Sequence, residues 1–184
     1  MLDTLLTTER LLLRRFAPND AADVEGLASA WEVADTTLRI PHPYPAGGGG
    51  AWIAMHLALV DARVATVFAI TERRSGALVG AIGIEIAEGG REGELGYWVG
   101  VPHWGRGYAT EAAGAMVAHA FSDAWSLERL TARYFIRNPA SGRVLEKIGM
   151  RDVEPVTVSK GDRAEEAMLR AIAAHEWRAR SRPS

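Results

Sequence analysis

The segment from Val99 to Glu111, VGVPHWGRGYATE, has the residue types of a phosphate-binding turn. An apolar strand ends at Val99, Gly105 and Gly107 permit a tight turn, and helix-forming residues follow. A helix N-terminus presents unpaired N–H groups and a partial positive charge, and these together bind pyrophosphate. Because Gly107 has no Cβ, a phosphate can approach its backbone closely, and Arg106 adds charge at the rim. The pattern predicts a pyrophosphate site; a simple helix start after a turn is the competing interpretation.

The segment does not match two other known glycine-rich motifs that bind phosphate. A P-loop requires a lysine and a hydroxyl residue after its second glycine, where this chain has Tyr108 and Ala109. A dinucleotide fingerprint requires a third glycine or alanine, where this chain has Thr110. A dinucleotide-binding domain is therefore the weakest of the alternatives, and competition by NAD would support it.

Hydrophobic periodicity and turn residues predict a mixed α/β sheet around the segment. The glycines at 47–50 are expected to form a flexible hinge before the second helix. Seven strands, mostly antiparallel, and about four helices are expected in a single domain spanning 1–184. The expected strands are 10–16, 65–71, 77–87, 92–99, 129–136, 151–159 and 165–173, and the expected helices are about 18–33, 51–60, 105–124 and 139–148.

Several segments together resemble the GNAT superfamily of acetyltransferases, in particular the branch that acetylates the alanine or serine N-termini of ribosomal proteins. The superfamily motif Gln/Arg-x-x-Gly-x-Gly/Ala corresponds to Trp104–Ala109, with Trp104 where Gln or Arg is usual. Further matching segments are TERLLLRRF (8–16), IPHPYP (40–45), ELGYWV (94–99), NPAS (138–141) and LEKIGM (145–150).

The resemblance implies acetyl-CoA as the donor, which would be held by the main chain of the glycine turn. Val99 N–H would contact the pantetheine arm and stabilise a developing oxyanion. Asn138 would bind pantetheine or hold two splayed strands, or it caps the helix that begins at Pro139. The cofactor-binding residues implied are Val99, Trp104, Gly105, Arg106, Gly107, Tyr108, Ala109, Thr110, Asn138 and Ser141.

Glu94 is the candidate general base, since it precedes an apolar strand where partial burial would raise its pKa. Alternatively it binds the acceptor, or it is a structural carboxylate paired with Arg91 or Arg133. Many family members carry a tyrosine acid in the later cofactor helix, but the corresponding residue here is Leu145. Ser141 is expected to protonate the leaving thiolate instead, unless it only bonds a local backbone group.

The resemblance also places His42 and Tyr44 in an acceptor wall or lid, although a surface loop rich in proline is an equal alternative. The acceptor is expected to be a primary amine, either a small molecule or a protein N-terminus. A non-catalytic acyl-CoA sensor would keep the cofactor turn without the chemistry.

Composition limits the remaining possibilities. The chain has no cysteine, which excludes a cysteine nucleophile and favours direct attack by the amine in a ternary complex. The formal net charge of −2 gives no sign of a nucleic-acid partner. No apolar run approaches the roughly 18 residues that a membrane helix needs, so no membrane partner and a cytoplasmic location are expected. Histidine spacing predicts no metal site, and a homodimer is possible.

Overall fold

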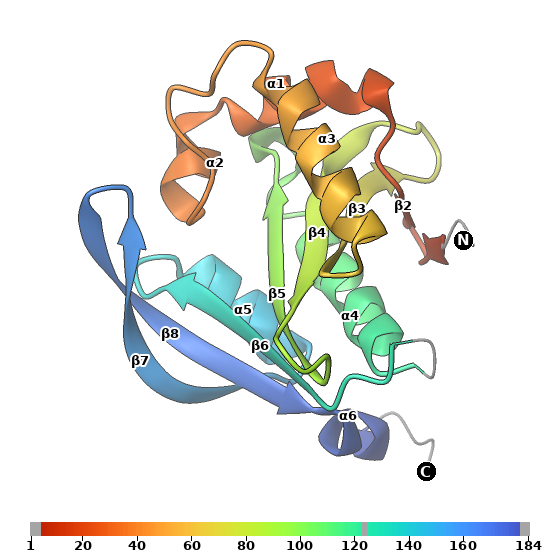
Figure 1. Cartoon of the computed structure of the whole chain (residues 1–184), viewed down its shortest axis with the longest axis vertical. Helices are drawn as coiled ribbons and strands as arrows, with labels where there is room; N and C mark the ends of the chain where they lie inside the picture. The colour runs from red at the N-terminus through yellow and green to blue at the C-terminus, as the bar shows by residue number, and fades with distance from the viewer. Residues whose placement is uncertain (1–4, 123–124, 181–184) are drawn as a thin grey trace.

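The computed structural model describes residues 5–122 and 125–180 and contains one eight-stranded sheet with helices on both faces (Figure 1). The order across the sheet is β1-β2-β3-β4-β5-β6-β8-β7. The predicted mixed, mostly antiparallel sheet is confirmed; it has eight strands rather than seven because a two-residue strand, β1, pairs with β2. The strands are β1 (Leu6–Thr7), β2 (Leu11–Arg14), β3 (Ala65–Glu72), β4 (Leu78–Ile86), β5 (Glu92–Val99), β6 (Arg129–Phe135), β7 (Arg151–Lys160) and β8 (Arg163–Ala173).

The helices number six α-helices and two short 3₁₀ turns in the described residues, against about four expected. Their bounds are η1 (Pro18–Asp20), α1 (Ala21–Ala28), α2 (Trp31–Thr36), α3 (Gly48–Asp61), η2 (Val101–His103), α4 (Tyr108–Ala120), α5 (Pro139–Lys147) and α6 (Ala174–Arg180). Helix α6 was not predicted. None of the helices in the described ranges is long and apolar enough to cross a membrane.

The single helix expected over 18–33 is divided in two. Ser29 ends the first part by donating its hydroxyl to the Glu25 carbonyl at 2.5 Å, a bond that competes with helix continuation. Ala30 is then extended, with ψ of 131°, before α2 begins. The helix expected to reach about Ala124 ends at Ala120, and residues 123–124 lie outside the described chain.

The glycine run was expected to be a flexible hinge, and this prediction is wrong. Gly48–Gly50 form the first turn of α3, after Gly47 in the left-handed conformation at φ 71°. A Cβ on Gly49 would lie 2.1 Å from the Ala21 carbonyl oxygen. Glycine is therefore needed here because α1 and α3 pack with their backbones in contact.

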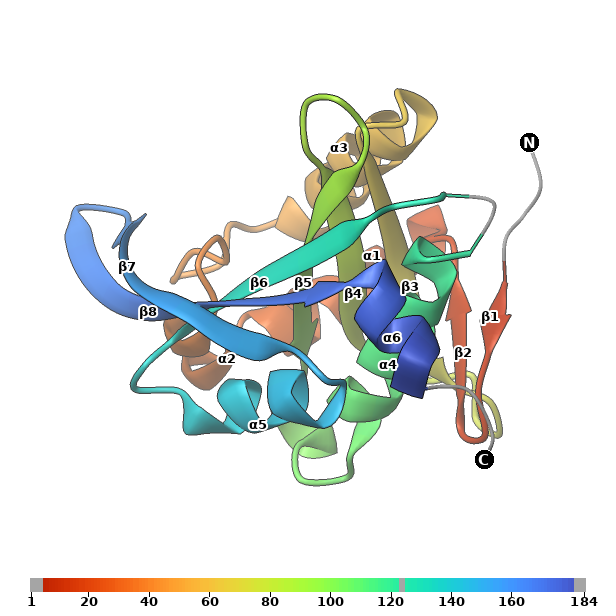
Figure 2. The same cartoon turned by 90° about the horizontal axis from the view of Figure 1, so that it is seen from below.

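The two faces of the sheet carry different helices. One buried cluster joins the sheet to α1, α2 and α3 through residues such as Val24, Val33 and Ile53. The other joins it to α4 and α5 through residues such as Met116 and Leu145. Figure 2 shows α4 and α5 on one side of the sheet and α3 on the other.

The strands β5 and β6 are parallel neighbours that pair only over their first residues. Register partners run from Glu92 with Arg129 to Glu94 with Thr131, and then the pairing stops. Beyond that point the two strands diverge, which Figure 1 shows as a wedge between them. The splay that the resemblance implied is therefore present, and it leaves one edge of β5 from Leu95 onward without a strand partner.

Candidate active site

The turn before α4 has the conformation that its glycines predict. Gly105 and Gly107 adopt φ of 73° and 80°, and Gly107 is the N-cap of α4. A Cβ on Gly105 would meet nothing within 4 Å, and one on Gly107 would meet only the end of the Arg10 side chain at 3.4 Å. The first N–H groups of α4 therefore face an open approach, as an anion site requires.

The main chain of Val99 faces the wedge between β5 and β6. The next amide, Gly100 N–H, donates to the Val79 carbonyl at 2.9 Å on the β4 side. Since successive residues of a strand alternate in direction, the N–H and C=O of Val99 point to the opposite side. Trp104 Nε1 donates to the Val99 carbonyl at 2.6 Å from that side. Trp104 thus ties the glycine turn to the end of β5, a role that its indole N–H allows.

A cavity of about 470 Å³ lies between this turn and α5. It contains nearly all the residues predicted to hold the cofactor. Arg106 is the exception, because its side chain extends toward Glu72, at 3.8 Å. The predicted residues on the cavity wall are Val99, Trp104, Gly105, Gly107, Tyr108, Ala109, Thr110, Asn138 and Ser141.

Sequence reasoning missed two basic residues on this wall. Arg143 and Lys147 are exposed and lie on the face of α5 that also presents Ala140 and Val144. These positions follow the i, i+3, i+4, i+7 spacing of one helix face counted from Ala140, and that spacing is the signal that identifies the two basic residues. His103 also lines the cavity, and its Nδ1 is buried with no hydrogen-bond partner in the described chain.

A second cavity, of about 450 Å³, lies on the opposite face of the sheet beside α3. Both cavities are lined by Tyr97, Trp98 and Ser141 and by Thr36 and Thr37. The cavities therefore meet at the wedge, where β5 has left β6. A reaction between two molecules bound on opposite faces is possible at this point.

Ser141 and Tyr97 form a hydrogen-bonded pair at the meeting point. Their hydroxyl oxygens are 2.8 Å apart, and either group can donate. Burial raises the pKa of Tyr97 to about 12, against a smaller lowering by the Ser141 bond. The phenol is therefore protonated at neutral pH. Asn138 caps α5 by accepting from Ser141 N–H at 3.3 Å, which is the capping role considered for it.

Glu94 lies on the wall of the second cavity and is paired with Arg133. Its Oε1 accepts from Arg133 Nε at 2.9 Å and its Oε2 from Nη2 at 2.7 Å. Arg91, the other partner considered, pairs with Glu128 instead. The carboxylate is one-third exposed. It is thus both ion-paired and open to a molecule in the cavity.

His42 and Tyr44 lie outside the linings of both cavities. The His42 ring packs edge-on against Trp31 at 5.2 Å between centroids. Tyr44 is partly buried against the cluster that contains Phe16 and Ile53. An acceptor-wall role for these two residues has no support from their positions, because the loop folds back over α2 and α3 instead of over the wedge.

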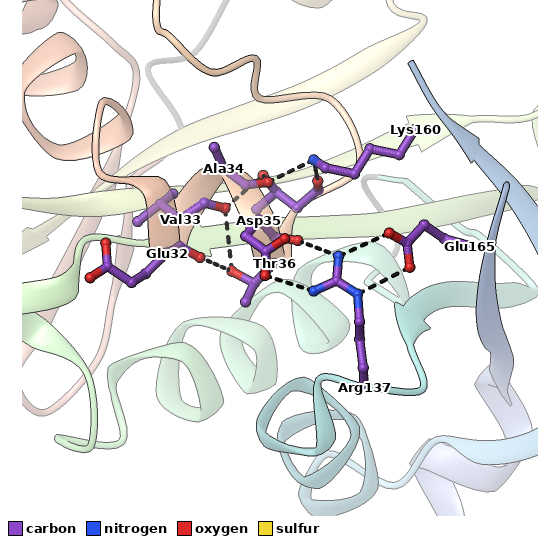
Figure 3. Close-up of polar contacts among 9 residues, drawn as sticks. Glu32, Val33, Ala34, Asp35, Thr36, Arg137, Lys160 and Glu165 are labelled. Carbon is purple, nitrogen blue, oxygen red and sulfur yellow. Dashed lines mark hydrogen bonds and ion pairs between the residues drawn. The ribbon is translucent and has the colours of Figure 1, made fainter. Parts of the chain in front are cut away.

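A group of charged residues holds α2 against the β7–β8 hairpin at the edge of the second cavity (Figure 3). Arg137 donates to Asp35 Oδ2 at 2.7 Å and to Glu165 Oε2 at 3.0 Å. Lys160 Nζ donates to the Ala34 carbonyl at 2.7 Å and to the Thr37 carbonyl, and burial lowers its pKa. These contacts hold α2 in place beside Thr36 and Thr37, which line both cavities, and sequence reasoning missed them. We call the group Asp35, Arg137, Lys160 and Glu165 the α2 clamp.

Metal ligands are not gathered anywhere in the part of the chain that the structure describes, where no group of three or more His, Cys, Asp or Glu side chains is suited to an ion.

Residues 10–151 match the acetyltransferase (GNAT) domain family, so the chain belongs to that family. Among curated proteins it is similar to an uncharacterized N-acetyltransferase, YoaA, of Bacillus subtilis (strain 168). The two are 30% identical over 148 residues, which is 80% of this chain and 82% of YoaA.

Solved structures with the same fold include a GNAT acetyltransferase from Bacillus anthracis, with a TM-score of 0.84 and 25% identity over 94% of this chain and 100% of that one. A ribosomal-protein-S5-alanine acetyltransferase from Vibrio fischeri has a TM-score of 0.80 and 19% identity over 95% and 99% of the two chains. Other structures of this fold, at 13–15% identity, were solved with acetyl-CoA or coenzyme A.

Proposed function

We propose that this chain transfers an acetyl group from acetyl-CoA to a primary amine, by direct attack within a ternary complex. One observation carries the proposal: two cavities on opposite faces of the sheet meet at Tyr97, Trp98 and Ser141, where β5 and β6 diverge. One cavity can hold the donor and the other the acceptor amine. The family of the chain and the absence of cysteine support the same scheme.

The residues of the first cavity fit acetyl-CoA. The open N-terminus of α4 suits the pyrophosphate, and the partnerless Nδ1 of His103 is a buried polar atom that a ligand can satisfy. Arg143 and Lys147 offer charge for further phosphate oxygens. When bound, acetyl-CoA supplies the thioester carbonyl, and the N–H of Val99, which points away from β4, would donate to its oxygen.

In this proposal Glu94, on the wall of the second cavity, and Ser141, at the meeting point, handle the protons. Glu94 is placed to accept a proton from the amine or to hold the amine as an ammonium ion. Ser141 would give its hydroxyl proton to the leaving thiolate, and Tyr97 would replace that proton; their 2.8 Å contact supports this relay. The acceptor is either a small amine or a protein N-terminus, and an α-amine, with a reference pKa of about 7.7–8.0, needs little help to lose its proton near neutral pH.

The proposal is tested by measuring free thiol release from acetyl-CoA with a panel of amines. The panel contains amino acids, polyamines, aminoglycosides and peptides with alanine or serine N-termini. We expect release to depend on both the enzyme and one class of amine. Tight acetyl-CoA binding with no release for any amine would contradict the proposal and favour a non-catalytic acyl-CoA sensor.

A further inference from the structure

Four charged side chains lie side by side in the second cavity, which we call the acceptor cavity, as two arginine–carboxylate pairs. Arg133 donates to both carboxylate oxygens of Glu94. Arg39 donates to both carboxylate oxygens of Glu85, and its Nη2 lies 2.9 Å from Glu85 Oε2. Glu85 and Glu94 are direct register partners on β4 and β5, so their side chains project from the same place on the same face. All four line the cavity.

Stability alone does not explain this arrangement. Like charges directly opposite each other on paired strands repel. The exposed fractions of the two pairs are 34% and 33% for Arg133 and Glu94, and 64% and 48% for Arg39 and Glu85. Ion pairs this exposed contribute about 0–1 kcal/mol each. Two carboxylates are thus kept together, with their guanidinium partners, at the wall of a cavity that opens on the reaction centre.

The charges of the cavity lining sum to zero. His56 also lines the cavity, and burial lowers its pKa, so it is neutral at pH 7. Tyr97 is neutral as well, since burial raises its pKa. The remaining charges are the two carboxylates and the two guanidinium groups. A polyamine would leave several positive charges without partners here, whereas a molecule with one positive and one negative group leaves none.

The free space and the apolar wall agree with a small zwitterion. Gly96 lies between Glu94 and Trp98 on the same face of β5, and a Cβ there would meet nothing within 4 Å. This leaves room directly beside the carboxylate. Trp52, Met55 and Leu59 of α3 supply apolar wall for a hydrocarbon group.

We propose that the acceptor is an amino acid or a close analogue, with a carboxylate near its amine and an apolar or aromatic side chain. Its carboxylate would take the planar donors of Arg133 or Arg39, which bind carboxylates with two parallel bonds. Its amine would bind Glu94, which is released from Arg133 when the acceptor carboxylate replaces it there. Binding of the correct acceptor would thereby free the carboxylate that accepts the amine proton. This inference rests on the proposed function, because it names the acceptor of that transfer.

The test uses matched pairs of amines in the thiol-release assay. Each amino acid is compared with the amine of the same skeleton that lacks the carboxylate: phenylalanine with 2-phenylethylamine, tryptophan with tryptamine, and leucine with isopentylamine. Spermidine and peptides with alanine or serine N-termini complete the set. We expect kcat/KM to be at least tenfold higher for the acid-bearing member of any pair that reacts.

Substitutions then locate the recognition. Arg133→Gln and Arg39→Gln are each expected to lower kcat/KM for the amino acid at least tenfold more than kcat/KM for the decarboxylated amine. Arg129→Gln is the matched control, because Arg129 is on the same strand, pairs with Glu92 and lies outside the cavity lining. We expect it to change neither rate.

The outcomes separate this inference from the proposed function. Equal or higher rates with decarboxylated amines, spermidine or peptides overturn the inference and leave acetyl transfer standing. If the arginine variants lose kcat/KM equally for both members of a pair, the inference is also overturned. The arginines would then act only through Glu85 and Glu94 and not on the carboxylate of the acceptor. No release with any amine overturns both proposals.

Discussion

At the scale of single residues, the structure adds Tyr97 to the predicted proton donor Ser141. The phenol, with its pKa raised to about 12, keeps its proton at neutral pH, and a thiolate with a reference pKa of about 8.5 needs only modest help to leave. A proton lost by Ser141 can be replaced across the 2.8 Å contact. The two hydroxyl groups are expected to act as one unit.

We predict that Ser141→Ala lowers kcat by about tenfold to a hundredfold, toward the lower end for acid catalysis. Tyr97→Phe removes the replacement donor and lowers kcat in the same direction. If the pair acts as a unit, the double variant is no worse than Ser141→Ala within about threefold, because coupled residues are not additive. Steady-state kinetics gives kcat, and calorimetry checks that acetyl-CoA affinity is unchanged. Losses that multiply would show independent roles.

A second residue-scale prediction concerns Glu94. Glu94→Gln is expected to lower kcat most at low pH, where the amine is mostly protonated, and less as rising pH supplies the free amine. A general base is typically worth about 10²–10⁴-fold. The measurement is the pH profile of kcat and of KM. A loss that is confined to KM and independent of pH would identify Glu94 as a ligand of the acceptor and not as the base.

At the scale of elements, hydrophobic periodicity and capping residues predicted most strands, α4 and α5, because these signals lie within short stretches of sequence. The pairing of Asn138 with the start of α5 is an example. Features that depend on distant contacts were not predictable in the same way. Gly49 is helical because α1 lies against it. Arg39 and Glu85 are 46 positions apart, and Tyr97 and Ser141 are 44 apart. The path of the loop that carries His42 and Tyr44 is set by packing against Trp31 and α3, and neither residue lines a cavity.

The N-terminus of α4 gives the first element-scale prediction. Gly107→Val places a β-branched residue at φ 80°, which costs about 1–3 kcal/mol of stability and puts side-chain atoms in the path of a phosphate. We expect coenzyme A binding to be lost while the protein stays folded. Gly76→Val is the matched control, because Gly76 has φ of 74°, open surroundings and a place in neither cavity lining. Calorimetry that shows unchanged coenzyme A affinity in Gly107→Val would exclude this turn as the phosphate site.

The start of α1 gives the second prediction at the scale of elements. Asp20 is 5% exposed, accepts two bonds of 2.7 Å from Arg14 and accepts from Ala17 N–H at 2.8 Å. Its bond with Arg14 lowers the pKa of Asp20. Asp20→Asn is expected to cost about 2–3 kcal/mol, below the 3–5 typical of fully buried pairs because Arg14 keeps some contact with water.

The pH dependence of that cost follows from the direction of the pKa shift. A carboxyl group with a lowered pKa stabilises the fold above its unfolded pKa, about 3.9, and that contribution is lost as pH falls through the folded value. Urea unfolding should therefore show a difference between wild type and Asp20→Asn at pH 7 that shrinks in acid. Asp61→Asn, which breaks an exposed pair with Arg15, serves as the control and should have little effect. A difference that persists unchanged into acid would contradict the account.

At the scale of the whole molecule, the fold brings two cavities from opposite faces of one sheet to a common point. The divergence of β5 and β6 makes this possible, because a continuous sheet would separate the two faces. The α2 clamp joins α2 to the β7–β8 hairpin next to the second cavity. Under the proposed scheme both substrates are held at once in a chain without cysteine, and no covalent acetyl-enzyme is needed.

The most direct test of the account is mass spectrometry with acetyl-CoA that carries an isotopic label in the acetyl group. The enzyme is incubated with the labelled donor, first alone and then with the amine that supports thiol release. We expect that the intact protein gains no acetyl group in the first incubation and that the label appears on the amine nitrogen in the second. A labelled protein that passes its acetyl group to the amine after the donor is removed, or an amine that never acquires the label, would contradict the account.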